Sequence, residues 1–340
     1  MARMFSPRTL VTVLRAGNAA ARLRATRDGQ AAVRLHVGAA GLGTGVLDAV
    51  RDGPATTADL ARRLGVARED LLEAFLRVLS VADLVREEDA RWSLAPAGRA
   101  VVSDDLVRAS YEAFAGFHTG VYRELDGLLA GAPGRRDVVE QGAVIARVSA
   151  AFEPFVDDVL REAVAEASPR RVLDAGCGAG LQLATMLAAA PGAEGVGIDL
   201  DEAAAALARR TLDDRGLGVR GRVLRADVRD LAVGTAGTFD LALLANVVYY
   251  VPAEERPALL AGIAALLAPG GTLLVVTTIA TPHLFSRHFD LLLRAQEGDM
   301  SLPDVDSLSA ALRAAGLLPR EPRRIAPGAP LIALEATRLR

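Results

Sequence analysis

One stretch, residues 171–187, constrains the fold of this chain more than any other. Its sequence, RVLDAGCGAGLQLATML, opens with a short apolar run that predicts a buried strand over Arg171–Asp174. A loop with Gly176, Gly178 and Gly180 follows, and helical apolar spacing begins directly after it. This order of strand, tight turn and helix places free backbone N–H groups at the carboxyl edge of a parallel sheet, where α/β proteins bind ligands.

Acidic residues end three predicted strands near this loop. Asp174 ends the first strand, and Asp199 ends the apolar run GVGID, roughly 20 residues beyond the loop, as a ribose-binding carboxylate requires. Asp227 closes GRVLRAD, the third predicted strand. Three such acids would surround one adenosine-like ligand. An NAD-binding sheet is the alternative, although Leu181 stands where the dinucleotide fingerprint GxGxxG carries its third glycine.

Several motifs follow one another in the second half of the chain. They are DAGCGAG, GIDL, RAD, FDLALLANVVYYVP and LLAPGGTLLVV. In this order they resemble the motifs of class I S-adenosylmethionine (SAM)-dependent methyltransferases. The resemblance covers residues 166–340 and implies an α/β fold with a Rossmann-like, seven-stranded methyltransferase sheet whose last strand is inserted antiparallel. Phe239–Ala245 and Gly271–Thr278 are the predicted fourth and fifth strands, and LLPREPRRIA and PLIALEATR alternate like a closing antiparallel pair.

The resemblance implies a binding site for SAM. The methionine part of SAM would lie against Asp174 and the glycine loop, and the ribose hydroxyls would bind Asp199. The adenine would lie against Leu200, with its amino group near Asp227. The residues that the resemblance assigns to the cofactor are Asp174, Gly176, Gly178, Gly180, Asp199, Leu200, Asp227, Val228 and Asn246.

Residues 31–103 carry a pattern of three helices followed by a hairpin. Helices are expected over 41–53, 58–66 and 67–84, and two strands over 84–102 around a turn at 88–90. This order resembles a winged helix. In its third helix the acids Glu69, Asp70 and Glu73 outnumber the arginines, and an acidic face repels the phosphates of DNA. A surface for protein contacts is therefore expected, although a winged-helix transcription regulator that senses a nucleotide-like ligand stays an alternative.

Joined to methyltransferase motifs, this region resembles the N-terminal dimerisation domain of the small-molecule O-methyltransferases, which implies a homodimer. Two helical segments flank it. Residues 1–30 form an arginine-rich arm whose predicted helix could lie across another subunit. Residues 104–165 form a helical linker that concentrates aromatic side chains, as the core between two domains or as a wall of the substrate pocket.

Composition excludes several classes of function. The formal net charge of −3 argues against general nucleic-acid affinity. All 39 basic residues are arginine, so a P-loop lysine and a Schiff-base lysine are excluded. The single cysteine, Cys177, allows neither an intrachain disulfide nor a cysteine metal site. No apolar run approaches the ~18–20 residues that cross a bilayer. A cytoplasmic protein without nucleic-acid or membrane partners is expected.

The candidate catalytic residues depart from the family pattern. Plant-type O-methyltransferases carry a His-Asp pair just after the fourth strand, and Tyr249 and Tyr250 stand at these positions here. A neutral phenol, with a pKa near ~10, is a poor base at pH 7, so Tyr249 is expected to donate a hydrogen bond to the substrate, to lie near the sulfonium as a cation–π partner, or to be a core residue. Related C-methyltransferases hold iron on the His-Asp pair; two tyrosines cannot, so no metal is expected. His118 in the linker and His288 in the segment that resembles the substrate-capping helix are the other candidates.

The sequence therefore predicts an enzyme that transfers a methyl group from SAM to a small-molecule acceptor in specialised metabolism. Oxygen is the most frequent acceptor in the family, and carbon and nitrogen stay open because the His-Asp pair is missing. A further alternative is an enzyme that uses SAM without transferring its methyl group to an acceptor.

Overall fold

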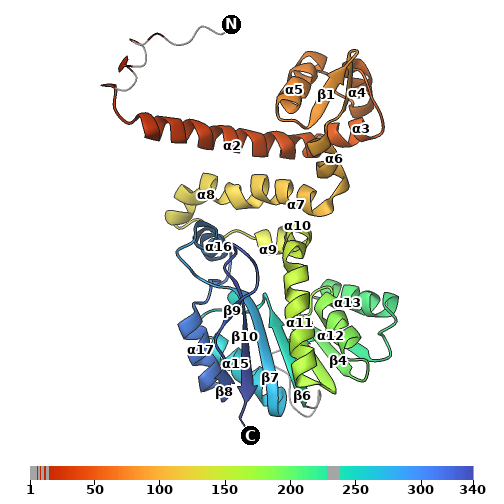
Figure 1. Cartoon of the computed structure of the whole chain (residues 1–340), viewed down its shortest axis with the longest axis vertical. Coiled ribbons are helices and arrows are strands. Elements are labelled where there is room, and N and C mark those ends of the chain that lie inside the picture. Colours follow the sequence, from red (N-terminus) through yellow and green to blue (C-terminus); the bar gives the residue numbers. More distant parts are fainter. Residues whose placement is uncertain (1–5, 7, 9–10, 13–14, 228–237, 340) are drawn as a thin grey trace. The chain divides into compact units, whose positions relative to one another are not determined.

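A computed structural model describes residues 6, 8, 11–12, 15–227 and 238–339. The chain divides into two compact units (Figure 1). The first comprises residues 1–123 and 141–148, and the second comprises residues 124–140 and 149–340. The predicted linker of residues 104–165 is thus divided: residues 104–123 and 141–148 belong to the first unit, and residues 124–140 and 149–165 belong to the second unit, which contains the large sheet.

The first unit is helical and carries one β-hairpin. Three helices and the hairpin share one apolar core, in the order that the sequence predicts. Thr56 begins the second of these helices with a capping box to Asp59, and Gly65 ends it in the left-handed conformation. Trp92 from the hairpin is buried in this core and donates its indole N–H to Thr57 Oγ1 at 3.0 Å. The elements are α2 (Ala19–Gly43), α3 (Val46–Arg51), α4 (Thr57–Leu64), α5 (Glu69–Val81), β1 (Val85–Glu88), β2 (Arg91–Leu94), α6 (Pro96–Ser103), α7 (Asp105–Ala113) and α10 (Gly142–Ser149).

Two expectations for this unit were wrong. The predicted second strand does not continue to residue 102, because Pro96 begins a helix, where its missing N–H costs nothing. The predicted boundary at residue 30 falls inside α2, which is 25 residues long. The apolar residues expected on one face of the arm helix, Leu10, Val13 and Leu14, lie outside the described residues.

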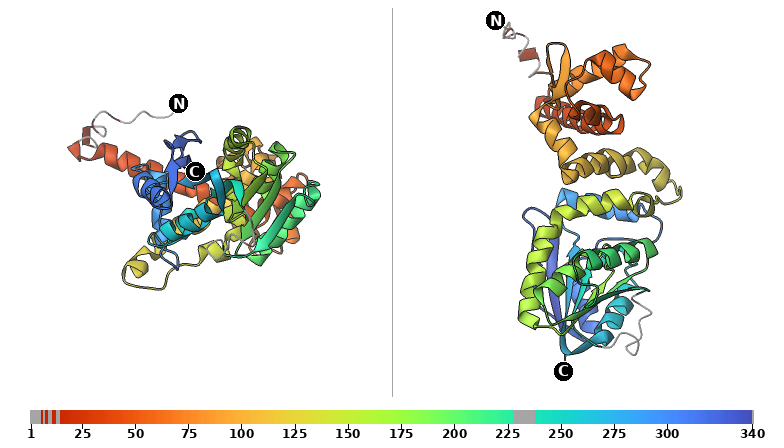
Figure 2. Two further views of the ribbon diagram at one scale, coloured as in Figure 1. Left: turned by 90° about the horizontal axis from the view of Figure 1, so that it is seen from below. Right: turned by 90° about the vertical axis from the view of Figure 1, so that its right-hand side faces the viewer.

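The second unit is a sheet between two layers of helices (Figures 1 and 2). Helices α11, α12 and α13 pack on one face and α15 and α17 on the other. Adjacent residues of a strand alternate between these two apolar layers, as Val172 and Leu173 do, which is why the strands read as continuous apolar runs. The helices are α8 (Thr119–Leu129), which spans the division between the units, α9 (Asp137–Glu140), α11 (Glu153–Ala167), α12 (Leu181–Ala189), α13 (Glu202–Asp214), α15 (Arg256–Leu266), α16 (Leu284–Arg294) and α17 (Val305–Ala314).

The last strand of the sheet is inserted antiparallel, as the resemblance to methyltransferases implies. The strands of the sheet run β5-β4-β3-β6-β7-β10-β8, and β10 is antiparallel to both of its neighbours. The two-residue strand β9 also pairs with β10, so the sheet has eight strands rather than the seven expected. The strands are β3 (Arg171–Ala175), β4 (Glu194–Asp199), β5 (Gly221–Arg225), β6 (Phe239–Ala245), β7 (Leu267–Thr278), β8 (Leu317–Pro319), β9 (Arg323–Arg324) and β10 (Leu331–Arg338).

Candidate cofactor and acceptor site

The glycine loop joins β3 to α12 at the carboxyl edge of the sheet. Gly176, Gly178 and Gly180 all have positive φ, at 81°, 50° and 75°. A Cβ on Gly176 would lie 2.4 Å from Val247 Cγ2, and one on Gly180 would lie 2.9 Å from Ala208 Cβ. A Cβ on Gly178 would meet nothing within 4 Å. Two of the glycines are therefore required by packing, whereas Gly178 borders open space.

Asp199 connects β4 to this loop. Its Oδ2 accepts the N–H of Gly178 at 2.8 Å, and its Oδ1 accepts the N–H of Asp201 at 3.0 Å. The loop is held to the same strand by the N–H groups of Gly176 and Cys177, which donate to Ile198 O at 2.8 and 2.9 Å. Because an ionised carboxylate offers about four lone-pair positions, Asp199 can still accept hydrogen bonds from ligand hydroxyls.

A cavity of about 480 Å³ opens beside the loop and Asp199. Its volume lies in the usual range for small-molecule sites. Six of the residues assigned to the cofactor line it: Gly176, Gly178, Asp199, Leu200, Asp227 and Asn246. The other lining residues are Ile198, Ala226, Ala245, Val247, Tyr250, Val251, Pro252 and Leu259. Val228, also assigned to the cofactor, lies outside the described residues.

The remaining two assigned residues, Asp174 and Gly180, do not line the cavity. Gly180 is the N-cap of α12. Asp174 is 1% exposed, and its Oδ2 has no hydrogen-bond partner among the described residues. Burial raises the pKa of Asp174 to about 7; the charge of Asp199 adds to this rise, and a hydrogen bond from the Leu183 backbone opposes it. A cationic group near this orphaned oxygen would stabilise the carboxylate, which fits the ammonium group of SAM.

The tyrosine pair occupies a short 3-10 turn, Val248–Tyr250, after β6. Tyr250 lines the cavity, whereas Tyr249 is buried against Leu293 and Leu302. The two tyrosine rings meet edge to face, with their centroids 4.6 Å apart. Burial raises the pKa of both tyrosines, and the interaction between their side chains also affects these pKa values. Sequence reasoning had singled out Tyr249, but its neighbour is the one at the cavity.

The two candidate histidines lie in different units. His288 is half-buried on α16, and burial lowers its pKa. It does not line the cavity, and its ring centroid is 6.3 Å from that of Phe285. His118 belongs to the first unit, in a π-helical segment after α7, where its buried ring lies 4.6 Å from Phe114 and 4.5 Å from Phe117.

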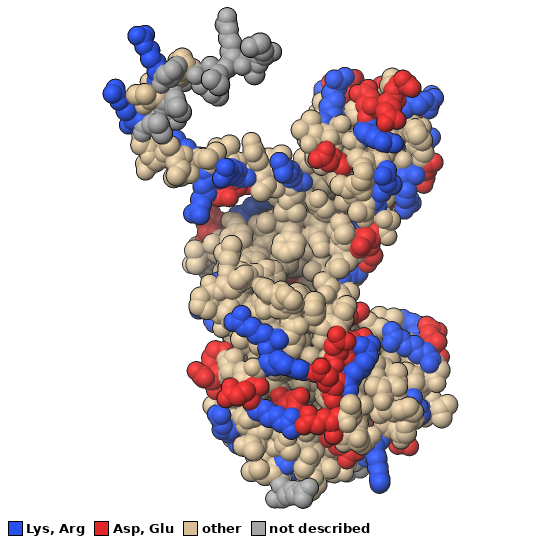
Figure 3. Space-filling view, in the orientation of Figure 1, with Lys and Arg blue, Asp and Glu red and all other residues tan. Residues whose placement is uncertain are grey.

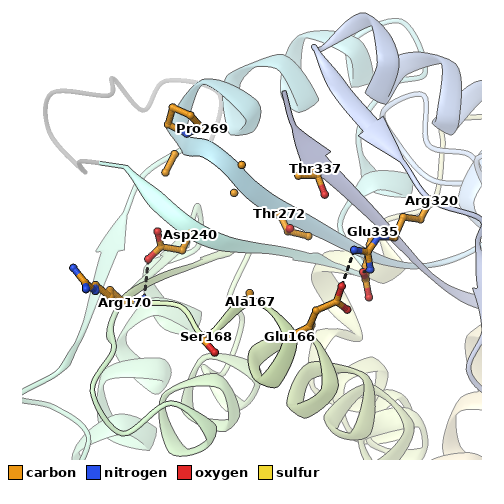
Figure 4. A pocket seen from close by; sticks show the side chains of 14 residues that line it. Glu166, Ala167, Ser168, Arg170, Asp240, Pro269, Thr272, Arg320, Glu335 and Thr337 are labelled. Carbon is orange, nitrogen blue, oxygen red and sulfur yellow. Dashed lines mark hydrogen bonds and ion pairs between the residues drawn. The ribbon is translucent and has the colours of Figure 1, made fainter. Parts of the chain in front are cut away.

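A second cavity, of about 510 Å³, lies at the amino ends of the parallel strands (Figure 4). Arg320 there joins Glu166 at 2.6 Å and Glu335 at 2.7 Å. Asp240 accepts the N–H groups of Arg170 and Arg171 at 2.8 and 2.9 Å. These charged groups are already paired, and cofactors of open α/β sheets bind at the carboxyl ends of the strands. The glycine-loop cavity is therefore the better cofactor site.

Sequence reasoning missed several residues of the site. Val247, Val251 and Pro252 line the cavity, and they belong to the motif FDLALLANVVYYVP that carried the resemblance. In the described ranges, no cluster of three or more His, Cys, Asp or Glu side chains is arranged to hold a metal ion. None of the described helices has both the length and the apolar character needed to cross a bilayer.

Comparisons with known proteins find methyltransferase relatives of this chain. Residues 172–271 match the family described as "Methyltransferase domain". The chain is 37% identical over 121 residues to the ubiquinone biosynthesis O-methyltransferase of Xanthomonas axonopodis pv. citri, covering 36% of this chain and 48%, about half, of that relative. It is 30% identical over 176 residues to the enzyme of the same name from Bordetella bronchiseptica, covering 50% of this chain and 70% of that relative.

Solved structures share the fold over nearly the whole chain. The mitomycin 7-O-methyltransferase MmcR is 22% identical, with a TM-score of 0.79 over 95% of this chain and 99% of its own. CalO1, a methyltransferase of calicheamicin biosynthesis in its SAH-bound form, is 24% identical, with a TM-score of 0.67 over 94% of this chain and 99% of its own. Together with the Bordetella relative, these findings show that the chain belongs to the class I SAM-dependent methyltransferases, whose cofactor is SAM.

Proposed function

We propose that this protein transfers the methyl group of SAM to a hydroxyl group of a small molecule in specialised metabolism. The observation that carries the proposal is the cavity of about 480 Å³ in which Asp199 is bound to the glycine loop and Leu200 is exposed beside it. The names of MmcR and CalO1 support an acceptor from natural-product biosynthesis, and the curated relatives support oxygen as the atom methylated.

Each cofactor residue has a proposed role. Asp174 and the glycine-loop N–H groups bind the methionine part of SAM, and Asp199 accepts hydrogen bonds from the ribose hydroxyls. Leu200 packs on the adenine. Asp227 binds the amino group of the adenine, and Asn246, which lines the cavity, also contacts SAM. Val228, outside the described residues, stays assigned to the cofactor by the resemblance. Bound SAM supplies an electrophilic methyl group on its sulfonium, so the protein contributes mainly the alignment of the acceptor with that group.

On the acceptor side, Tyr249, His288 and His118 stay the proposed catalytic residues, and Tyr250 joins them because it lines the cavity. The tyrosines act as neutral hydrogen-bond donors, since burial raises their pKa values. His288 is neutral at pH 7, since burial lowers its pKa, and a neutral imidazole can accept the proton of the acceptor hydroxyl.

The first unit is proposed to be a winged-helix-like dimerisation domain of a homodimer. In and next to α5, Arg68 forms an ion pair with Asp70 and Arg77 forms one with Glu73. These arginines are therefore neutralised within the protein and are poorly suited to bind DNA phosphates. On the face drawn in Figure 3, acidic and basic side chains are interspersed, without the broad basic surface that nucleic acid requires. A cytoplasmic location is also proposed. The cytoplasm is reducing, and the chain, whose single cysteine is the buried Cys177, needs no intrachain disulfide that such a compartment would reduce.

Calorimetry with SAM and with its demethylated product, SAH, tests the cofactor site. The wild-type protein is expected to bind both, and Asp199→Ala is expected to lose binding because the ribose partner and the Gly178 contact disappear together. Asp214→Ala, at an exposed position on α13, is the matched control and should bind normally. Failure of the wild-type protein to bind either ligand would contradict the proposal.

Mass spectrometry tests the transfer itself. Incubation of the protein and SAM with a panel of phenols and hydroxyquinones is expected to give a product heavier by one CH₂ group, carried on oxygen. A product methylated on carbon or nitrogen would correct the acceptor atom. SAM consumption without any methylated product would instead favour an enzyme that uses SAM without an acceptor.

A further inference from the structure

Arg256 is a buried cation that forms no ion pair within 4 Å among the described residues. Three acids act on it only over a longer distance: Asp290, Asp304 and Glu254. It begins α15, is 7% exposed, and burial lowers its pKa below the usual value. Its hydrogen bonds go to neutral oxygens: Nε donates to Val251 O at 3.0 Å, and Nη2 donates to Ser301 O at 2.6 Å and to Ser301 Oγ at 3.0 Å. Burying a charged group in this way is unfavourable unless its hydrogen bonds are well made.

These bonds close a small network around the tyrosine turn. The N–H of Ser301 donates to Tyr249 O at 3.2 Å, so Ser301 is held to the turn both directly and through Arg256. Val251, the other acceptor of Arg256, lines the cofactor cavity next to Tyr250. One guanidinium thus fixes the cavity wall and the segment around Ser301 to each other.

The segment around Ser301 is in turn joined to α16. The N–H of Leu302 donates to Asp290 Oδ1 at 2.9 Å, and Leu302 packs with Tyr249 in one apolar cluster. The ring of Phe289, also on α16, meets Tyr249 edge to face at 5.4 Å between centroids. Through Ser301, Arg256 therefore connects the wall of the cofactor cavity with the helix that carries His288.

We infer that Arg256 is a positioning residue for methyl transfer: it fixes the Tyr249–Val251 turn against Ser301 and thereby sets where the acceptor lies relative to the cofactor. The inference rests on the proposed function. A buried apolar side chain at this position would satisfy packing, but it could not hold two main-chain carbonyls at a fixed separation. Alignment matters in this chemistry, because a displacement of about 1 Å at the reacting atoms can cost on the order of 100-fold in rate.

The test compares Arg256→Met and Arg256→Lys with Arg320→Met. Arg320 also joins separate elements through its guanidinium, but at the opposite end of the strands, which makes it a control for loss of an arginine contact (Figure 4). The readouts are the Kd for SAM, hydrogen exchange by mass spectrometry, and kcat and KM with a phenolic acceptor that the wild-type protein methylates.

In Arg256→Met, exchange is expected to rise in residues 248–252 and 299–303, while the glycine-loop peptide stays protected. The value of kcat should fall by about 100-fold, with a much smaller change in the Kd for SAM. Arg256→Lys keeps a charged donor and should recover part of kcat. Arg320→Met should leave all of these values unchanged.

Two results would overturn the inference. One is unchanged exchange at both segments in Arg256→Met. The other is a loss of protection and of SAM binding in parallel with kcat, which would assign Arg256 to general stability. If the wild-type protein methylates no acceptor, the proposed function fails, and the exchange experiment still decides whether Arg256 fixes the turn to Ser301.

Discussion

Asp174 is the residue whose protonation should most directly affect cofactor binding. Its carboxyl is buried with one unpartnered oxygen, and burial raises its pKa from 3.8 to about 7. The folded protein therefore holds a proton that the unfolded chain releases near pH 4. The contribution of this group to stability is greatest at low pH and decreases as the pH rises from about 4 to about 7.

Binding of a cationic ligand group beside Asp174 favours the ionised carboxylate, lowers its pKa and releases its proton. The affinity for SAM should therefore weaken by up to about tenfold per pH unit below 7 and level off above it. Calorimetry in buffers with different ionisation enthalpies measures both the Kd and the protons released. Asp174→Asn should bind more weakly at pH 8 and lose the pH dependence. A wild-type Kd that stays constant between about pH 5.5 and 7.5 would show that Asp174 does not ionise on binding.

The tyrosine pair allows a test of which hydroxyl acts on the acceptor. Tyr250 lines the cavity, and the ring of the buried Tyr249 meets it edge to face. Tyr250→Phe should therefore lower kcat more than Tyr249→Phe, by about tenfold for the loss of one hydrogen bond to a reacting group. Because burial raises both pKa values, neither substitution should alter the pH profile of kcat below pH 10. Loss of an alkaline or neutral limb in Tyr250→Phe would instead identify a tyrosinate base.

At the residue scale, the sequence was most informative where several signals coincide. Asp199, Leu200 and Asp227 follow strands at regular spacing beside a glycine loop, and all three line the cavity. The roles of Tyr250 and Arg256 could not be predicted from the sequence. Tyr250 lies in a three-residue 3-10 turn, which is too short for the spacing of apolar residues to indicate which side chains are buried. An arginine at the start of a helix is usually solvated, and only the contact with Ser301, 45 residues away, reveals that this one is buried.

The glycine loop allows a prediction at the scale of an element. Gly178 and Gly216 both have positive φ, at 50° and 69°, and a Cβ on either would meet nothing within 4 Å. Replacement by alanine should cost each roughly 1–2 kcal/mol of stability, because the left-handed conformation is unfavourable for alanine. Only Gly178→Ala should also weaken SAM binding, by about tenfold or more, because its methyl group would occupy the space where backbone and ligand approach closely.

Thermal unfolding and calorimetry on the two variants separate these effects. Gly216→Ala, after α13, serves as the control for backbone strain alone. Equal SAM affinity in both variants would show that the cofactor does not approach the backbone at Gly178.

The boundaries of helices and strands were predicted correctly where the local sequence alone determines them. Phe239–Ala245 was predicted as a strand and is β6, since an apolar run between polar ends needs no tertiary information. The segment 84–102 alternates in sequence, but Pro96 and the close packing of Gly98 against Leu84 O favour a helix after β2. The helical linker predicted over 104–165 contains a π-helical segment at Phe114–His118, with ψ of −112° at Gly116, a conformation that apolar spacing does not encode.

At the scale of the whole molecule, the first unit exposes a group of apolar side chains that a partner would cover. Val33 on α2 is 59% exposed and Val81 at the end of α5 is 87% exposed. Both line a cavity of about 720 Å³ between these helices, together with Val37 and Val78. Grouped apolar exposure of this kind is typical of a protein contact surface, and a second copy of the chain is the proposed occupant.

The variant Val33→Asp/Val81→Asp tests this proposal, because paired copies would have to bury four carboxylates at the contact. Light scattering after gel filtration should give a dimer for the wild-type protein and a monomer for the variant. Val219→Asp is the control, since that valine is 100% exposed in the second unit and belongs to no described cavity. The glycine loop belongs to the second unit, so the SAM affinity of the monomeric variant should stay close to that of the wild-type protein. A variant that remains dimeric would exclude this surface, and a wild-type monomer would exclude the homodimer itself.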